Sequence, residues 1–348
     1  MPPWMDELRS CKLCSWECGV NRLSDEPGVC RVNLPNVATI NMSLATRSCT
    51  VTFLGCNFRC IYCNAYRISQ YPEVGWFYKG YIEPEELAKE VLSVLKSPKS
   101  LEANIDAVSF TGGEPTIHLP YIERLVDELR RENKDLRVGF ATNGFASKQA
   151  MQRIIDLSSF INFEIKAYKD EIHKVLTGAP VEPVLKNAEN LIKNAKDKIR
   201  VIRTVIIPGI NDSDVDDIAE FIASIDPFTP YRIIGFRPNF MLYFHPGPSK
   251  HLMEKLTEKA KMRGLKNVSW SGYYPYKVSK KVLEVSKKVD YCRIEQAELA
   301  SAYLTLAGCI MKPRDCGKCS LKSSCPAMLW QPWSLQDKLQ TNSKEDED

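Results

Sequence analysis

Hydrophobic positions in the middle of the chain follow two different spacings. Short apolar runs rich in β-branched and aromatic residues predict strands, whereas segments with an apolar residue at every third or fourth position predict amphipathic helices. The predicted strands are residues 49–55, 105–110, 136–143, 161–168, 199–209 and 231–239.

The predicted helices alternate with these strands. One covers Ile82–Lys96, with Pro84 in its first turn, and another covers 214–224. A third carries its apolar face at Ile122, Leu125, Val126 and Leu129. Parallel strands need a crossover connection, so this alternation indicates βαβ units. We therefore predict an α/β fold with a partial parallel (β/α)6 barrel, whose functional residues gather at the carboxyl ends of the strands.

Composition narrows the class of protein. The chain has 348 residues, of which 44% are hydrophobic, and this is enough for one large domain with appendages or for two domains. Basic and acidic residues nearly balance, and the resulting net charge of +4 is too small to indicate a nucleic-acid partner, although it does not exclude one. No apolar run approaches the length of a membrane span, and the first ten residues lack the features of a signal peptide. We expect a cytoplasmic protein.

The cysteines carry the clearest chemical information. There are 13, an odd number, and most fall in three clusters. A secreted disulfide scaffold would be shorter and its cysteines would be spread through the chain. Clustered thiols in a reducing compartment are instead typical of metal ligands. Cys49 stands apart from the clusters, and we expect it to be buried in a strand.

The central cluster follows the first predicted strand directly, with the spacing Cys56-x3-Cys60-x2-Cys63. Three thiolates within eight residues can converge on one soft-metal centre. Structural zinc sites are closed by four ligands, whereas a catalytic metal keeps one position open. The alternatives are a zinc knuckle that borrows a fourth ligand and ordinary buried cysteines.

This spacing, with Tyr62 before the last cysteine, resembles the motif of the radical S-adenosylmethionine (SAM) superfamily. The resemblance implies that Cys56, Cys60 and Cys63 bind three irons of an oxygen-sensitive [4Fe-4S] cluster and that SAM chelates the fourth. One electron, supplied by a ferredoxin- or flavodoxin-type donor, would then cleave SAM to methionine and a 5′-deoxyadenosyl radical. The radical would abstract hydrogen from a substrate, under anaerobic conditions.

Two further elements at strand ends resemble parts of the same family. Gly112, Gly113 and Glu114 follow the second predicted strand like the family's GGE element. The glycines would let backbone approach the ligand closely, and Glu114 could accept from the methionine ammonium. Thr142 and Asn143 resemble a TNG element that faces SAM in the activating-enzyme branch. Taken alone, a Gly-Gly pair is an ordinary turn.

Later strand ends offer weaker candidates. Lys166 and Arg203 match positions near SAM in the activating-enzyme branch, although the residue two before the lysine is Glu where that branch often has Asp. The alternative role for both residues is a structural ion pair at the end of a strand. His173, His245 and Arg237 are similar to positions that line the barrel mouth, but a lone histidine is more often structural.

The N-terminal cysteines are Cys11, Cys14, Cys18 and Cys30. Four thiolates at these gaps fit either a closed zinc site or an auxiliary iron–sulfur cluster. Their sequence context ahead of the radical SAM motif resembles proteins grouped with pyruvate formate-lyase activating enzymes.

The C-terminal set leaves the same two alternatives open and resembles part of a SPASM-type pattern. Its cysteines are Cys309, Cys316, Cys319 and Cys325, and Cys292 could replace the first.

These motifs divide the chain into four regions. We expect a Cys-rich metal region with little helical or strand periodicity at 1–45, a radical SAM core at 46–276, a helical and Cys-rich metal region at 277–330, and a polar, disordered tail at 331–348. The core would activate a glycine of a partner protein, or modify a peptide, RNA, lipid or small molecule. The alternative from another class is a non-catalytic zinc or iron–sulfur adaptor that binds RNA or protein.

Overall fold

The computed structural model describes residues 2–26, 28–69, 78–242 and 245–273. They fall into two compact units, the first made of 1–57, 67–164 and 183–202, and the second of 58–66, 165–182 and the described residues from 203 onward. The C-terminal cysteine set, Cys292 and the predicted tail lie outside the described residues.

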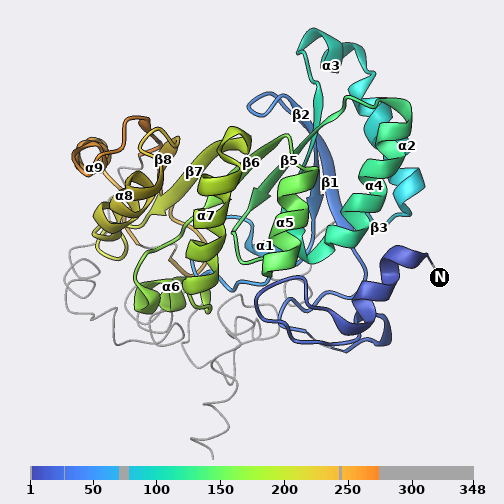
Figure 1. The fold of residues 1–348 in the computed structure, drawn as a ribbon, viewed down its shortest axis with the longest axis horizontal. Helices are drawn as coiled ribbons and strands as arrows, with labels where there is room; N and C mark the ends of the chain where they lie inside the picture. The colour runs from blue at the N-terminus through green and yellow to red at the C-terminus, as the bar shows by residue number, and fades with distance from the viewer. Residues whose placement is uncertain (1, 27, 70–77, 243–244, 274–348) are drawn as a thin grey trace, which may run out of the picture. The chain divides into compact units, whose positions relative to one another are not determined.

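The first unit is built on a mostly parallel sheet (Figure 1). Its strands run in the order β3-β1-β2-β4-β5-β6. Strands β2, β4, β5 and β6 pair in parallel, whereas β1 pairs antiparallel with both β2 and β3. The bounds are β1 (Asn36–Ser43), β2 (Ser48–Phe53), β3 (Gly80–Tyr81), β4 (Ala107–Gly112), β5 (Arg137–Thr142) and β6 (Phe160–Glu164).

Helices of the first unit bury their apolar faces on its strands and on each other. Figure 1 shows α2 (Pro84–Leu95) beside α4 (Leu119–Glu132), and α5 (Lys148–Leu157) follows next to α4. The predicted face of α4 is fully buried, and burying one such aliphatic side chain stabilises the fold by about 1.5–3 kcal/mol. The remaining helices are α3 (Pro98–Glu102) and the 3₁₀ helices Pro3–Ser10, Arg22–Ser24, Pro115–His118 and Lys196–Lys198.

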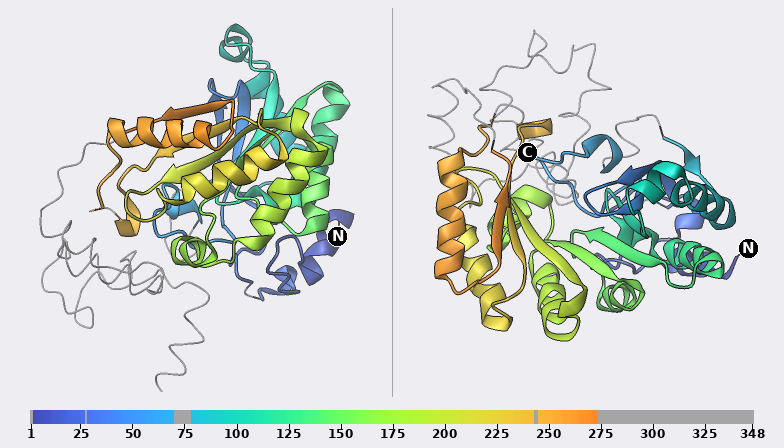
Figure 2. Two further views of the ribbon diagram at one scale, coloured as in Figure 1. Left: turned by 60° about the vertical axis from the view of Figure 1, so that its left-hand side comes forward. Right: turned by 90° about the horizontal axis from the view of Figure 1, so that it is seen from above.

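The second unit has its own helix–strand layer. Strands β8 (Tyr231–Gly235) and β9 (Val268–Ser271) pair in parallel, and α8 (Asp214–Ile225) packs beside α9 (Lys250–Met262) next to them (Figure 2). It also contains α6 (Asp170–Thr177) and the 3₁₀ helix Phe240–Leu242. Three elements have residues in both units: α1 (Tyr66–Ser69), α7 (Glu182–Asn194) and β7 (Ile199–Ile206).

The predicted α/β class with a mostly parallel sheet is confirmed. The six predicted strands correspond to β2, β4, β5, β6, β7 and β8. The structure adds β1 within the N-terminal region, where the sequence showed little periodicity. The apolar pattern of β1 is weak because the strand is only partly buried and carries Asn and Thr among its apolar residues.

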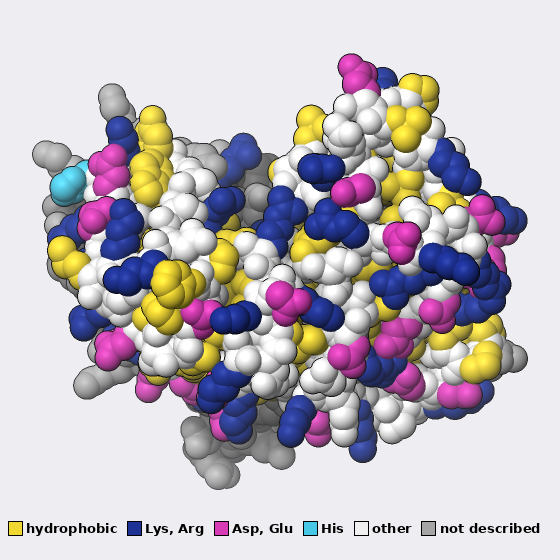
Figure 3. Space-filling view, turned by 45° about the horizontal axis from the view of Figure 1, so that its top comes forward, with side chains coloured by type: hydrophobic (Ala, Val, Ile, Leu, Met, Phe, Trp, Pro, Cys, Tyr) yellow, Lys and Arg dark blue, Asp and Glu magenta, His cyan; other side chains and the backbone are white. Residues whose placement is uncertain are grey.

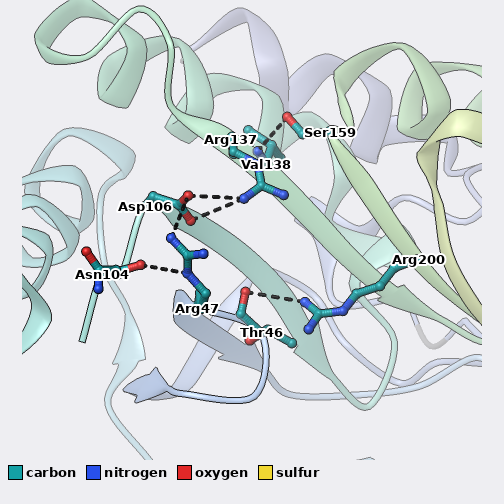
Figure 4. A network of polar contacts seen from close by, with 8 residues as sticks. All are labelled: Thr46, Arg47, Asn104, Asp106, Arg137, Val138, Ser159 and Arg200. Atoms are coloured by element: carbon teal, nitrogen blue, oxygen red, sulfur yellow. Dashed lines mark hydrogen bonds and ion pairs between the residues drawn. The ribbon is translucent and has the colours of Figure 1, made fainter.

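A polar network joins the amino ends of the parallel strands in the first unit (Figure 4). Asp106, just before β4, accepts hydrogen bonds from Arg47 at 3.4 Å and from Arg137 at 3.1 Å. Arg47 directly precedes β2, and Arg137 is the first residue of β5. Arg200 at the start of β7 donates to the Thr46 carbonyl at 3.3 Å. Charges of both signs are interspersed over the face drawn in Figure 3, in line with the small net charge.

Candidate active site

The carboxyl ends of β2 and β4 approach each other closely. Gly113 donates its amide to the Phe53 carbonyl at 3.1 Å, and Glu114 donates its amide to the Gly55 carbonyl at 2.9 Å. A Cβ on Gly113 would lie 1.8 Å from the Gly55 oxygen and 3.1 Å from the Cys56 Cβ. Only glycine fits between these two stretches of backbone, and this contact between the ends of β2 and β4 lies directly beside Cys56.

Glu114 joins the end of β4 to the end of β5. Its Oε1 accepts from the Thr116 amide at 3.1 Å, from Thr116 Oγ1 at 2.5 Å and from Thr142 Oγ1 at 2.7 Å. Its Oε2 accepts from the Asn143 amide at 2.7 Å. The side chain is 1% exposed, and burial raises the pKa of the carboxyl even though its four donors favour the ionised form. Oε2 therefore keeps most of the free acceptor capacity of this carboxylate.

The side chain of Asn143, just after β5, contacts the start of the cysteine loop. Its Nδ2 lies 3.8 Å from the Cys56 sulfur and donates to Asn57 Oδ1 at 2.8 Å. Cys56 is buried, and an amide donor beside its sulfur favours a thiolate there. Asn57 was not among the predicted site residues, although its position next to the first cysteine of the motif is a usable signal.

The other two motif cysteines belong to the second unit. Arg59 donates its amide to the Thr177 carbonyl at 2.8 Å, and Ile61 donates to the Leu176 carbonyl at 3.1 Å, so the loop is fixed against the end of α6. The Cys63 amide donates to the Cys60 carbonyl at 3.2 Å, which forms a turn between the two thiols. Cys60 is buried and Cys63 is half-buried.

Lys166, Tyr62 and Arg203 also lie in the second unit. Lys166 is buried, and its Nζ lies 5.7 Å from the centre of the Tyr62 ring, within cation–π distance. Asn211 Nδ2 donates to the Lys166 carbonyl at 2.8 Å, which fixes the backbone after β6. Arg203 is half-buried on β7, where its carbonyl accepts from the Ile165 amide at 3.1 Å.

Each of the two histidine candidates is buried and hydrogen-bonded to a backbone carbonyl. His173 Nδ1 donates to the Ala179 carbonyl at 2.7 Å, and burial lowers its pKa to about 4. His245 Nε2 donates to the Pro208 carbonyl at 2.8 Å, and burial likewise lowers its pKa to about 4. Both rings are therefore neutral at physiological pH. Arg237 is exposed.

The N-terminal cysteines lie close together in the first unit. Cys11, Cys14 and Cys30 are buried, and Cys18 is exposed. Burial, with the neighbouring thiols, raises the pKa of Cys14 and of Cys30. In the part of the chain that the structure describes, no group of three or more His, Cys, Asp or Glu side chains is arranged to hold a metal ion as it stands.

The residues around the central motif suit an iron–sulfur cluster. Their sulfur atoms are soft ligands, and two of the three are buried. The amide of Asn143 beside Cys56 is the kind of donor that tunes such sulfurs. In the first unit, Gly113 and Glu114 add a close backbone and a buried carboxylate at the same strand ends.

A mostly parallel α/β sheet with a three-cysteine loop after its first parallel strand is the arrangement expected of an enzyme that cleaves SAM by radical chemistry. Residues 50–222 match the model of the radical SAM superfamily. The chain belongs to this superfamily, which implies a [4Fe-4S] cluster and SAM as cofactors and makes the protein an enzyme rather than an adaptor.

Individual proteins are also similar to this chain. The chain is 26% identical over 269 residues to an uncharacterised protein of Methanocaldococcus jannaschii, with 73% of each chain covered. It is 27% identical over 191 residues to the pyruvate formate-lyase-activating enzyme of Staphylococcus epidermidis, covering 52% of this chain and 71% of that enzyme.

Among solved structures, a domain of the pyruvate-formate lyase-activating enzyme from Bacteroides vulgatus is 23% identical with a TM-score of 0.40. The match covers 48% of this chain and 99% of that chain. No helix within the described residues is long and apolar enough to cross a membrane.

Proposed function

We propose that Cys56, Cys60 and Cys63 hold the [4Fe-4S] cluster of this enzyme and that its substrate is a glycine residue of a partner protein. When bound, the cluster and SAM supply a 5′-deoxyadenosyl radical that can abstract a hydrogen atom. The observation that carries the proposal is the placement of Cys56, which is buried beside a glycine that admits no side chain and beside the amide of Asn143.

The chain's own residues would then bind and orient the cofactors. Asn143 stabilises the Cys56 thiolate, and Gly113 lets the end of β4 lie against the Gly55 backbone beside Cys56. The free acceptor capacity of Glu114 Oε2 suits the methionine ammonium of SAM. Lys166 and Arg203 are the cations proposed to face the SAM carboxylate and adenosine.

A protein substrate is favoured over a small molecule by the relationship to an activating enzyme. The relative from Staphylococcus epidermidis is named for its action on pyruvate formate-lyase. The extra cysteine sets favour the competing possibility of direct modification of a peptide, RNA, lipid or small molecule.

Anaerobic reconstitution of the full chain with iron and sulfide tests the central site. We expect a brown protein that releases 5′-deoxyadenosine from SAM and dithionite. Cys60→Ala should abolish this release, whereas Cys49→Ala, which removes a buried thiol from β2, is the matched control and should retain it. Turnover that persists in the Cys60→Ala protein would overturn the assignment.

The glycine substrate is tested in the same assay with extract from source cells grown on Cα-deuterated glycine. Abstraction from glycine should transfer deuterium to 5′-deoxyadenosine. Release of undeuterated 5′-deoxyadenosine that nevertheless depends on the extract would favour the other substrate classes.

A further inference from the structure

The N-terminal cysteines are brought together by a short backbone pairing. Cys11 donates its amide to the Val20 carbonyl at 3.0 Å and accepts from the Gly19 amide at 3.0 Å. A Cβ on Gly28 would lie 3.4 Å from the Cys18 sulfur and 3.9 Å from the Cys30 sulfur, so both thiols line the same glycine. The backbone pairing at Cys11 and the turn at Gly28 therefore bring cysteines from both ends of residues 11–30 close together.

A buried arginine lies against this group. Arg22 is 1% exposed. Its Nε donates to the carbonyls of Val32 at 2.8 Å and Asn33 at 3.0 Å, and its Nη1 donates to the Ile117 carbonyl at 2.5 Å. Nη1 also lies 3.9 Å from the Cys11 sulfur. Within the described residues, Nη2 has no hydrogen-bond partner.

The charge of Arg22 needs an anion that protonated thiols do not supply. A guanidinium is ionised in any protein, and a buried one is costly unless a negative group lies beside it. Within the described ranges, no carboxylate forms an ion pair with Arg22; the charged candidates at this position are the cysteines. Four thiolates around Zn²⁺ or around a [4Fe-4S]²⁺ cluster carry a net charge of about −2, which would supply the negative charge that the buried guanidinium needs.

We propose that Cys11, Cys14, Cys18 and Cys30 form a closed four-thiolate metal centre, separate from the Cys56 set, with Arg22 as its buried counter-cation. On binding, the four thiols release their protons to solvent as the sulfur–metal bonds form, and no electron is transferred. Cys18 is exposed, so its side chain can turn toward the other three without displacing core residues.

The centre has a mechanical connection to the catalytic loop of the first unit. Trp16 Nε1 donates to the Asn57 carbonyl at 2.8 Å, directly after Cys56. Ser15 donates its amide to the Phe145 carbonyl at 3.0 Å, and Cys14 forms an isolated bridge with Ala146 just after Asn143. A metal that fixes residues 11–30 would therefore also position the segments that carry Cys56 and Asn143.

Thiol protection and metal analysis of the anaerobically prepared full chain test the proposal independently of SAM cleavage. Both are measured in the Cys60→Ala protein, in which the central site is disabled. We expect Cys11, Cys14, Cys18 and Cys30 to react with iodoacetamide about tenfold more slowly than after chelator treatment. A further Cys14→Ser change should remove the metal of this centre. Equal reactivity with and without chelator would overturn the proposal.

The metal analysis also identifies the occupant. Zinc in a colourless protein and iron with a visible absorption that dithionite bleaches both support a four-thiolate centre, and they distinguish its two forms. Failure of the wild-type protein to cleave SAM, with protection intact, would contradict only the proposed function.

Arg22→Gln tests the counter-cation, because glutamine keeps a donor but loses the charge. Metal release to a competing chelator should become about tenfold faster, and Arg22→Lys should restore part of the retention. Lys12→Gln removes an exposed cation from the same segment and is the control, with an unchanged release rate expected. Release from Arg22→Gln at the wild-type rate would show that the arginine has no such role.

Discussion

At the scale of single residues, Glu114 has a second role that its place in the GGE element does not reveal. The family resemblance assigns it to the SAM ammonium, whereas the structure shows it accepting four hydrogen bonds from Thr116, Thr142 and Asn143. The carboxylate therefore links the ends of β4 and β5 through its own hydrogen bonds.

Replacing Glu114 with Gln should destabilise the fold. The amide nitrogen of the glutamine would replace a carboxylate oxygen that accepts hydrogen bonds, and it would then face N–H or O–H donors. An unsatisfied buried polar group costs about 1–3 kcal/mol. The free energy of unfolding in urea measures this loss. Glu102→Gln, an exposed change at the end of α3, is the control and should stay within about 0.5 kcal/mol. Equal stability of the two variants would contradict a structural role for the hydrogen bonds of Glu114.

The sequence was sufficient to find the candidate residues but not their contacts. Cys56, Cys60 and Cys63 follow from spacing, because the chain itself keeps them close. The hydrogen bonds of Glu114 depend on where the backbone of a neighbouring strand places its amides. Arg22 was missed because only tertiary burial, which brings its guanidinium to the carbonyl of Ile117, distinguishes it from a surface arginine.

At the scale of secondary structure, the two ends of the parallel strands differ in character. The carboxyl ends of β2, β4 and β5 carry buried polar groups around Cys56, whereas their amino ends carry the exposed Arg47–Asp106–Arg137 network (Figure 4). The proposed cluster and SAM contacts all lie at the first end, so we expect changes at the second to affect stability alone.

Asp106→Asn should cost less than about 1 kcal/mol of stability. The three side chains are 41–55% exposed, and ion pairs in such positions are weak, although the change also leaves Arg47 and Arg137 without a shared anion. Urea denaturation at low salt should detect the loss, and at about 1 M salt it should shrink because screening shortens the range of the interaction. Glu132→Gln, which removes a 3.8 Å contact with Lys96, serves as the control. A large, salt-insensitive loss would contradict this account.

Elements with a strong periodic pattern were predicted well. Helix α4 and strands β4 and β5 bury their apolar residues almost completely, so the pattern and the structure coincide. Strand β1 was missed because its register depends on pairing with β2 and β3 and not on its own apolar residues. Short, half-exposed strands are specified by their neighbours, which a local pattern does not contain.

At the scale of the whole molecule, three of the four histidines are buried as neutral rings. Besides His173 and His245, His118 donates its Nε2 to the Leu54 carbonyl at 2.8 Å, and burial lowers its pKa to about 3. An unfolded chain takes up these protons near pH 6.5, while the folded chain does not. Their contribution to stability is therefore complete above about pH 6.5 and is lost as pH falls.

His118→Gln should weaken this pH dependence. Between about pH 6.5 and 4, the slope of unfolding free energy against pH should fall by about 1.4 kcal/mol per unit relative to the wild type. Comparing slopes removes the opposing effect of Glu114 and Asp214, whose raised pKa values act in the other direction in both proteins. Urea titrations at several pH values measure the slopes, and identical slopes would show that His118 is not a neutral buried group.

The position of Trp16 gives the protein an intrinsic optical probe. Its indole is bonded to the backbone next to Cys56 and packs 5.2 Å from the Phe145 ring. Iron–sulfur clusters absorb light at the wavelengths where tryptophan emits, so a cluster on Cys56, or one on the N-terminal cysteines that flank Trp16, would quench the fluorescence of this indole by energy transfer. The chain has six tryptophans, so assembly and loss of a cluster near this indole could be followed in real time as the difference in emission between the wild type and Trp16→Phe.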